Sequence, residues 1–296
     1  MESGLLMAIG GAEDKVRERV ILRAFVEAAG GPDANVVVLA TASELAETGD
    51  RYAAIFESLH ADTVEVLRVR SREDALDAGS GVLDLLEFAS GLFITGGSQL
   101  RISAALGGTA IADKIRRRHA AGMVVAGTSA GAAILSEHMI SMGDSGATPR
   151  RRLVQMGKGL GLAPELVIDQ HFRQRDRLGR LVTALSYNPD PLGIGVDEDT
   201  AAVIHDGELR VIGSGAVTVL DASGVRYTDC SEVRRGQALS MLGLKLDFLT
   251  SGCRYDLRRR VGLPPLAGKP SLEQEEVANL SYSLSPGPGE RGDGIK

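Results

Sequence analysis

Several residue types are scarce in this sequence, and each scarcity narrows the possible classes of protein. The chain of 296 residues has no tryptophan and only 4% aromatic residues, so aliphatic side chains must form most of its core. Its two cysteines, Cys230 and Cys253, lie far apart without C-x-x-C spacing. This excludes a disulfide framework and gives no zinc site.

Long apolar segments and an excess of positive charge are also missing. The apolar run at residues 4–9 is too short to span a membrane and has no basic region before it, so it is interpreted as a buried strand. The formal net charge is −6, which argues against a nucleic-acid partner because phosphate binding needs a basic surface. We therefore expect a cytoplasmic enzyme with no membrane or nucleic-acid partner.

The first two thirds of the chain alternate short apolar strands with helical patterns. Residues 36–40 form a continuous apolar run that begins with three β-branched valines, which is typical of strands buried on both faces of a parallel sheet. This alternation favours a doubly wound α/β sheet. The other predicted strands lie at residues 5–9, 63–69, 92–95 and 123–126, and the predicted helices at residues 15–29, 50–59, 82–88, 99–106 and 110–120.

The pattern changes after about residue 190, where short strands follow one another closely. Asp206-Gly207 between two of them indicates a hairpin, because a type I′ turn needs residues that tolerate positive φ. We expect an antiparallel strand set appended to a mostly parallel sheet, in one α/β domain at residues 1–262. Residues 263–296 are rich in proline, glycine and glutamate and are predicted to be a poorly ordered tail. The late strands are predicted at residues 192–196, 201–205, 208–212, 216–220 and 241–249.

The sharpest chemical signal is the segment GTSAG at residues 127–131, which fits the G-x-S-x-G pattern of a nucleophile elbow. It follows the strand at residues 123–126 and precedes a good helix start, which is the context that the pattern requires. A serine on such a turn presents its hydroxyl, and the N–H groups of the next helix face the developing oxyanion. Ser129 is therefore the candidate nucleophile. The alternative is a glycine-rich turn whose serine only caps a helix.

A serine nucleophile needs a general base, and histidine is the usual one. Of five histidines, His171 follows a predicted strand at residues 166–168, where ligand sites of open α/β sheets gather. His60 and His119 close predicted surface helices. His138 falls in the helix expected after the serine, and His205 precedes the hairpin turn and is expected to be exposed.

A carboxylate should orient the imidazole and stabilise the imidazolium. Asp197, Glu198 and Asp199 follow the strand predicted at residues 192–196, again at a strand end. The residues alone do not choose among the three. The order serine, histidine, acid differs from the order serine, acid, histidine of α/β hydrolases, which counts against an ordinary esterase.

Two further groups fit this chemistry. The N–H of Gly97, in a Gly-Gly pair after a strand, is a candidate oxyanion donor beside that of Ala130. Arginines also follow His171, and bidentate guanidinium groups suit carboxylate substrates, although a solvated helix face is the alternative. Three of them share one face at helical spacing, namely Arg173, Arg177 and Arg180.

Together these segments resemble cyanophycinases, which belong to the serine peptidase family that also contains aspartyl dipeptidase. The resemblance covers about residues 4–262, and its several ordered motifs make it much more specific than the elbow alone. The similar segments are IGGAEDK at residues 9–15, GGSQLR at 96–101, GTSAGA at 127–132, DQHF at 169–172, GIGVDEDT at 193–200 and LTSGCRY at 249–255.

The resemblance implies a flavodoxin-like or class I glutamine-amidotransferase-like α/β fold and a triad of Ser129, His171 and Glu198. It implies release of β-Asp-Arg dipeptides from the chain ends of cyanophycin, without a metal or cofactor, by a protein that is often a homodimer. The implied substrate contacts are Gln99, Asp169, Gln170, Arg175, Arg177 and Arg180.

Two residues depart from the family pattern. Ser98 stands where an aspartate or asparagine is expected, and Cys253 replaces an acidic residue. Both leave the triad intact and bear on substrate preference. The rival interpretations are a related peptidase that acts on α- or β-aspartyl dipeptides, and a non-catalytic α/β protein that binds a small ligand.

Overall fold

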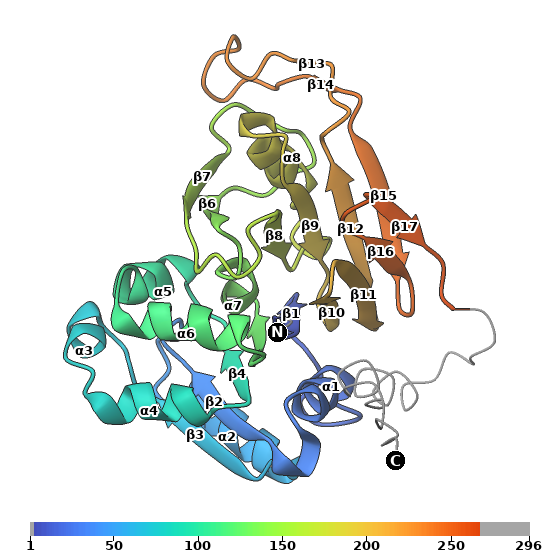
Figure 1. The fold of residues 1–296 in the computed structure, drawn as a ribbon. Coiled ribbons are helices and arrows are strands. Elements are labelled where there is room, and N and C mark those ends of the chain that lie inside the picture. The colour runs from blue at the N-terminus through green and yellow to red at the C-terminus, as the bar shows by residue number, and fades with distance from the viewer. Residues whose placement is uncertain (1–2, 267–296) are drawn as a thin grey trace, which may run out of the picture.

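The computed structural model describes residues 3–266, and its largest element is a nine-stranded sheet in the order β17-β16-β11-β10-β1-β5-β4-β2-β3 (Figure 1). Neighbouring strands from β1 to β3 are parallel, as the continuous apolar runs predict. These strands are β1 (Leu6–Ile9), β2 (Asn35–Leu39), β3 (Thr63–Leu67), β4 (Gly91–Ile94) and β5 (Val124–Thr128).

The other end of this sheet is antiparallel and begins where β10 pairs with β1. The hairpin between β10 and β11 turns at Asp206 (φ 45°) and Gly207 (φ 75°), so the predicted type I′ turn is confirmed. The antiparallel strands are β10 (Thr200–His205), β11 (Glu208–Gly213), β16 (Arg254–Asp256) and β17 (Val261–Leu263).

A second, four-stranded sheet has the order β15-β12-β9-β8, and its β8 and β9 are parallel. The antiparallel strands predicted beside the parallel sheet are confirmed in β10, β11, β16 and β17, while the other late strands lie in the second sheet. Its strands are β8 (Leu166–Gln170), β9 (Leu192–Val196), β12 (Ala216–Asp221) and β15 (Lys245–Thr250). Two small ribbons pair β6 (His138–Gly143) with β7 (Val154–Lys158), and β13 (Tyr227–Thr228) with β14 (Met241–Leu242).

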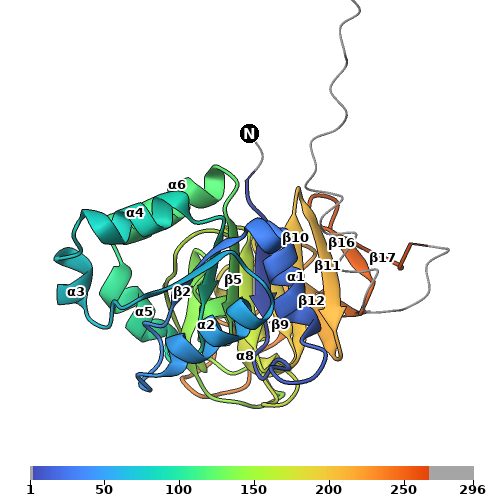
Figure 2. The ribbon, with the colours of Figure 1, turned by 90° about the horizontal axis from the view of Figure 1, so that it is seen from below.

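Helices cover both faces of the parallel strands, which explains why those strands are apolar throughout (Figure 2). Val36 and Val38 pack with α1 and α2, whereas Val37 and Leu39 pack with α4, α5 and α6 on the opposite face. The helices are α1 (Val20–Ala28), α2 (Thr48–Ser58), α3 (Arg72–Leu76), α4 (Ser80–Phe88), α5 (Gln99–Leu106), α6 (Ala110–Ala120), α7 (Ala130–Ala133) and α8 (Leu178–Tyr187), with a 3₁₀ turn η1 (Gly31–Asp33).

The helix predicted at residues 15–29 begins only at Val20. The Asp14 carboxylate accepts three backbone N–H groups between Val16 and Arg19, which holds this segment in turns. Arg19 then has a left-handed backbone with φ 53°, which a continuous helix cannot contain.

The helix expected after Ser129 is also shorter than predicted. Helix α7 is a single turn, because backbone N–H groups of residues 160–163 bond to the carbonyls of residues 134–136. His138 therefore lies in β6 and not in a helix. Among residues 3–266, no helix is long and apolar enough to cross a membrane.

Backbone hydrogen bonds tie the second sheet to the parallel strands at their carboxyl ends. The N–H of His171, after β8, donates to the carbonyl of Gly10, after β1, at 2.8 Å. The N–H of Asp199, after β9, donates to the carbonyl of Gly11 at 2.9 Å. The N–H of Ser129, after β5, donates to the carbonyl of Ile9, the last residue of β1, at 2.9 Å. The end of β1 and the loop after it thus bring the ends of three further strands together.

Candidate active site

Ser129 lies on a strained turn between β5 and α7. Its backbone has φ 54° and ψ −113°, a conformation that non-glycine residues rarely adopt. The flanking glycines allow this turn: a Cβ on Gly127 would lie 2.0 Å from the carbonyl oxygen of Gly131, and one on Gly131 would lie 2.1 Å from that of Ile94. The strand, turn and helix predicted around the G-x-S-x-G pattern are therefore present.

Ser129, His171 and Glu198 form one hydrogen-bonded chain. The Ser129 Oγ lies 2.9 Å from His171 Nε2, and His171 Nδ1 lies 2.6 Å from Glu198 Oε1. These distances suit a base that accepts a proton from the hydroxyl and a carboxylate that fixes the tautomer of the ring. The three side chains come from the ends of β5, β8 and β9.

The two aspartates beside Glu198 are engaged elsewhere. Asp197 accepts the backbone N–H groups of Arg173 at 3.0 Å and Ala216 at 3.3 Å. Asp199 accepts the N–H of Asp14 at 2.9 Å and the hydroxyl of Ser214 at 2.9 Å. Of the three candidate acids, only Glu198 lies within hydrogen-bond distance of the His171 imidazole.

The imidazole of His171 rests directly against the backbone of Gly11. A Cβ at Gly11 would lie 2.4 Å from Cε1 and 2.6 Å from Nε2 of the ring, so no other residue fits there without moving the base. Burial lowers the pKa of His171; hydrogen bonding to Glu198 opposes that change, and the positive charge of Arg175 reinforces it. The ring therefore remains neutral, and able to accept a proton, at a lower pH than an ordinary histidine.

The two predicted oxyanion donors belong to segments next to Ser129, namely the start of α7 and the turn after β4. Ala130 is the first residue of α7, so its N–H has no intrahelical partner. The Gly96-Gly97 turn follows β4, and a Cβ on Gly96 would lie 3.2 Å from the Cβ of Ser129. Gly97 has φ 140° and approaches Ala42 so closely that a Cβ would lie 2.1 Å from its carbonyl oxygen. The turn is thus fixed against the elbow.

The predicted substrate contacts fall into two groups, of which the larger is buried. Arg180 donates through Nε to Asp169 at 2.6 Å and also through Nη2, and Arg177 donates to Gln170 Oε1 at 2.7 Å. The side chains of Asp169 and Arg180 are 1% and 5% exposed, so solvent does not reach this pair. Burial lowers the pKa of Arg177 to about 10, while the charge of Asp169 opposes that change.

The helical face predicted for three of the arginines does not exist. Helix α8 begins only at Leu178, and the turns before it leave Arg173 exposed, 5.9 Å above the ring of Phe248. Arg177 and Arg180 instead point to the buried Asp169.

Two of the predicted contacts are accessible from outside. Arg175 is exposed beside His171. Gln99 is half-buried at the start of α5 and donates through Nε2 to the carbonyl of Ile140 at 3.0 Å. Ser98, which departs from the family pattern, caps the same helix by accepting the N–H of Arg101 at 3.3 Å.

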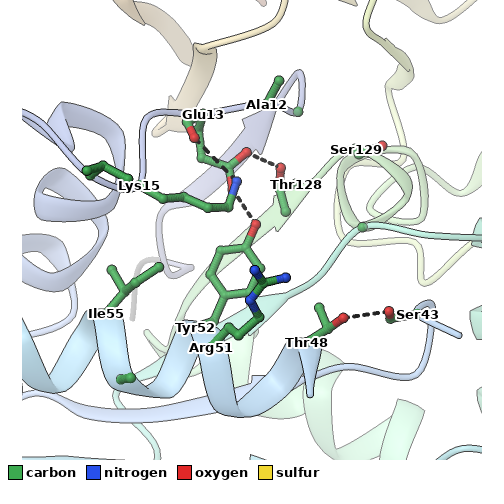
Figure 3. Close-up of a pocket in the computed structure, with 14 residues that line it drawn as sticks. Ala12, Glu13, Lys15, Ser43, Thr48, Arg51, Tyr52, Ile55, Thr128 and Ser129 are labelled. Carbon is green, nitrogen blue, oxygen red and sulfur yellow. Dashed lines mark hydrogen bonds and ion pairs between the residues drawn. The ribbon is translucent and has the colours of Figure 1, made fainter. Parts of the chain in front are cut away.

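A cavity of about 680 Å³ opens beside Ser129 on the side of α2 (Figure 3). Its buried carboxylate, Glu13, accepts hydrogen bonds from Thr128 at 2.7 Å and from Tyr52, and pairs with Lys15 at 3.0 Å. Burial raises the pKa of the Tyr52 hydroxyl, and the negative charge of Glu13 raises it further. The remaining lining residues are Gly11, Ala12, Val16, Ser43, Thr48, Arg51, Ala54, Ile55 and Gly96.

No motif in the sequence predicted this cavity. Glu13 and Lys15 lie in a segment that resembles the family, directly after β1, and charged residues at a strand end were the available signal. Arg51 and Tyr52 come from α2, and no spacing in the sequence places that helix beside the elbow. Among residues 3–266, no three histidine, cysteine, aspartate or glutamate side chains are grouped so that they could hold a metal ion.

The other histidines lie apart from this chain of contacts. His119 was expected on a surface helix, but it is buried and its Nδ1 lies 3.1 Å from the carbonyl oxygen of Met123. Burial lowers its pKa. The segment before β1 covers the end of α6, because the N–H of Gly4 donates to the carbonyl of His119 at 2.7 Å.

Comparison with known proteins gives one consistent result. The profile of "Peptidase family S51" matches residues 5–212. A cyanophycinase of Trichormus variabilis is 46% identical over 262 residues, covering 88% of this chain and 87% of its own. One of Geminocystis herdmanii is 42% identical over 266 residues, covering 89% and 96%. The crystal structure of a peptidase from an acI-B1 actinobacterium matches with a TM-score of 0.65 at 20% identity, covering 86% of this chain and 97% of that one, which confirms the predicted α/β fold class.

Proposed function

We propose that this chain, which belongs to peptidase family S51 and is a serine-type peptidase, is an exopeptidase that releases β-Asp-Arg dipeptides from cyanophycin. The proposal is supported most directly by the hydrogen-bonded chain Ser129–His171–Glu198, with distances of 2.9 and 2.6 Å. The relatives named cyanophycinase support the substrate class.

The proposed reaction has two steps. The Ser129 Oγ attacks the scissile carbonyl carbon while His171 Nε2 takes its proton, and the negative oxygen accepts hydrogen bonds from the N–H groups of Gly97 and Ala130. The C–N bond then breaks, and His171 returns the proton to the leaving amine. Water, deprotonated by His171, attacks the acyl-enzyme and frees Ser129, while Glu198 stabilises the imidazolium in both steps.

We propose two kinds of contribution from the residues implied to contact substrate. Gln99 and Arg175 are accessible beside the elbow and are suited to direct contact. The other four residues form a buried hydrogen-bonded cluster on the segments next to His171 in the sequence, namely Asp169, Gln170, Arg177 and Arg180. Their burial favours a supporting role, in which this charge cluster fixes the loop that carries the base. Direct binding of a substrate carboxylate by these arginines stays a prediction.

Incubation of purified cyanophycin with the protein, followed by mass spectrometry of the released products, tests the proposal. Wild-type protein should release β-Asp-Arg dipeptide, and Ser129→Ala should reduce the rate by at least about 10³-fold. Hydrolysis of aspartyl dipeptides without release from the polymer would favour the related dipeptidase. We also expect a homodimer, which light scattering of the purified protein at several concentrations would test.

A further inference from the structure

The cavity beside Ser129 carries one guanidinium that no group among residues 3–266 neutralises. Arg51 lines it from the first turns of α2, and its exposed side chain makes no hydrogen bond or ion pair with any other residue between 3 and 266 (Figure 3). An uncompensated cation on the wall of a partly enclosed cavity favours an anionic ligand. Guanidinium groups suit carboxylates in particular, because two parallel N–H groups match two oxygens.

Within residues 3–266, no carboxylate forms an ion pair with Arg51: Glu47, one helical turn earlier, is exposed and unpaired, and the other carboxylates near Arg51 in the sequence or in the cavity are engaged elsewhere. Glu13, the buried acid of the cavity, pairs with Lys15 at 3.0 Å and accepts two hydroxyl groups. Asp50, the preceding residue, pairs with Arg68 at 2.6 Å, and Glu44 pairs with Arg101 at 2.8 Å. The charges of Glu13 and Lys15 therefore cancel within the cavity, and the positive charge of Arg51 remains.

The rest of the cavity is suited to an aliphatic chain. The ring of Tyr52 and the side chains of Ala54 and Ile55 project from α2, and Val16, which is 87% exposed, lies at the margin. Ser129 opens into the same space. A ligand that fills it would thus combine a carboxylate, several methylene groups and a bond within reach of the nucleophile.

We propose that Arg51 binds a free carboxylate of the aspartyl-arginine unit next to the bond that Ser129 attacks. In this polymer the arginine is joined through its α-amino group to the aspartate side chain, so each arginyl branch keeps its own carboxylate and three methylene groups. A carboxylate also ends the polyaspartate main chain, and either group has the required chemistry. The inference deepens the proposed function and rests on it.

Steady-state kinetics with a short aspartyl-arginine oligomer would test the assignment. Arg51→Gln should raise KM by about 10- to 100-fold, because a charge-assisted bond is lost, while kcat changes by less than about threefold. Arg51→Lys should recover part of the loss. The matched control is Arg117→Gln, which removes an exposed arginine of α6 on the opposite face of the sheet and should leave KM unchanged.

Two derivatives of the oligomer identify which carboxylate is bound. In one the arginyl branches end in amides, and in the other only the main chain does. The derivative that lacks the bound carboxylate should show the raised KM with wild-type protein and no further rise with Arg51→Gln. If wild type cleaves the oligomer and Arg51→Gln keeps its KM, or neither derivative differs from the parent, the inference is wrong and the proposed function stands. If wild type does not cleave the oligomer or polymer, the proposed function fails and the inference with it.

Discussion

A single methyl group at Gly11 should disable the catalytic base. The Cβ of Gly11→Ala would lie 2.4 Å from Cε1 of His171, 2.6 Å from Nε2 and 3.1 Å from Nδ1. To restore an ordinary contact of about 3.5 Å, the ring must retreat by about 1 Å. The hydrogen bonds at 2.9 Å to Ser129 and 2.6 Å to Glu198 cannot both survive that movement. A misplacement of this size costs about 10²-fold in rate.

The backbone of Gly11 adds a second effect, which a control can separate. Its φ of +98° is strained for alanine, so the substitution should also destabilise the protein by about 1 kcal/mol. Gly30→Ala is the matched control, because Gly30 has φ +124° but its Cβ would meet no atom closer than 3.5 Å. Both variants should lower the midpoint of thermal unfolding, whereas only Gly11→Ala should lower kcat/KM by about 10²-fold. A wild-type kcat/KM in Gly11→Ala would show that the ring of His171 does not depend on the missing side chain at residue 11.

Two further predictions concern titration and the buried charges. His171 must be neutral to accept a proton, and burial lowers its pKa. As the pH decreases, kcat/KM should therefore begin to fall only below about pH 6.5, the ordinary pKa of histidine. Glu198→Gln should move this acidic limb to still lower pH, since Glu198 raises the pKa; an unchanged limb in the pH–rate profile would contradict the assignment. Asp169→Asn should destabilise the protein by about 3–5 kcal/mol in urea unfolding, because it leaves Arg180 and Arg177 buried without their carboxylate. A decrease of the free energy of unfolding by less than about 1 kcal/mol would show that water or another group takes the place of the Asp169 carboxylate.

Local patterns in the sequence predicted much of this molecule. The elbow at Ser129 was identified because its strand, turn and helix differ in the spacing of their apolar residues. The strand end at His171 was identified from the apolar run before it. Helix α6 was predicted with its observed bounds of Ala110–Ala120. The acidic segment after β9 was also located correctly, although the residues alone did not choose Glu198 over its two neighbours.

The features of the structure that the sequence did not predict depend on contacts between distant segments of the chain. The division of the late strands between two sheets follows from pairing partners that no local period encodes. The burial of Arg177 and Arg180 follows from the position of Asp169, and the cavity depends on how α2 packs beside the elbow. The tail predicted from composition at residues 263–296 lies outside the described residues from position 267 onward.

The role of Ser129 as nucleophile can be tested by reacting the protein with a serine-directed phosphonate and locating the adduct by peptide mass spectrometry. We expect one adduct, on Ser129, in wild-type protein and none in Ser129→Ala. Labelling should be slow in His171→Ala, because the hydroxyl then lacks its base at 2.9 Å. An adduct on another residue, or equal labelling of Ser129→Ala, would contradict the assignment of Ser129 as the nucleophile.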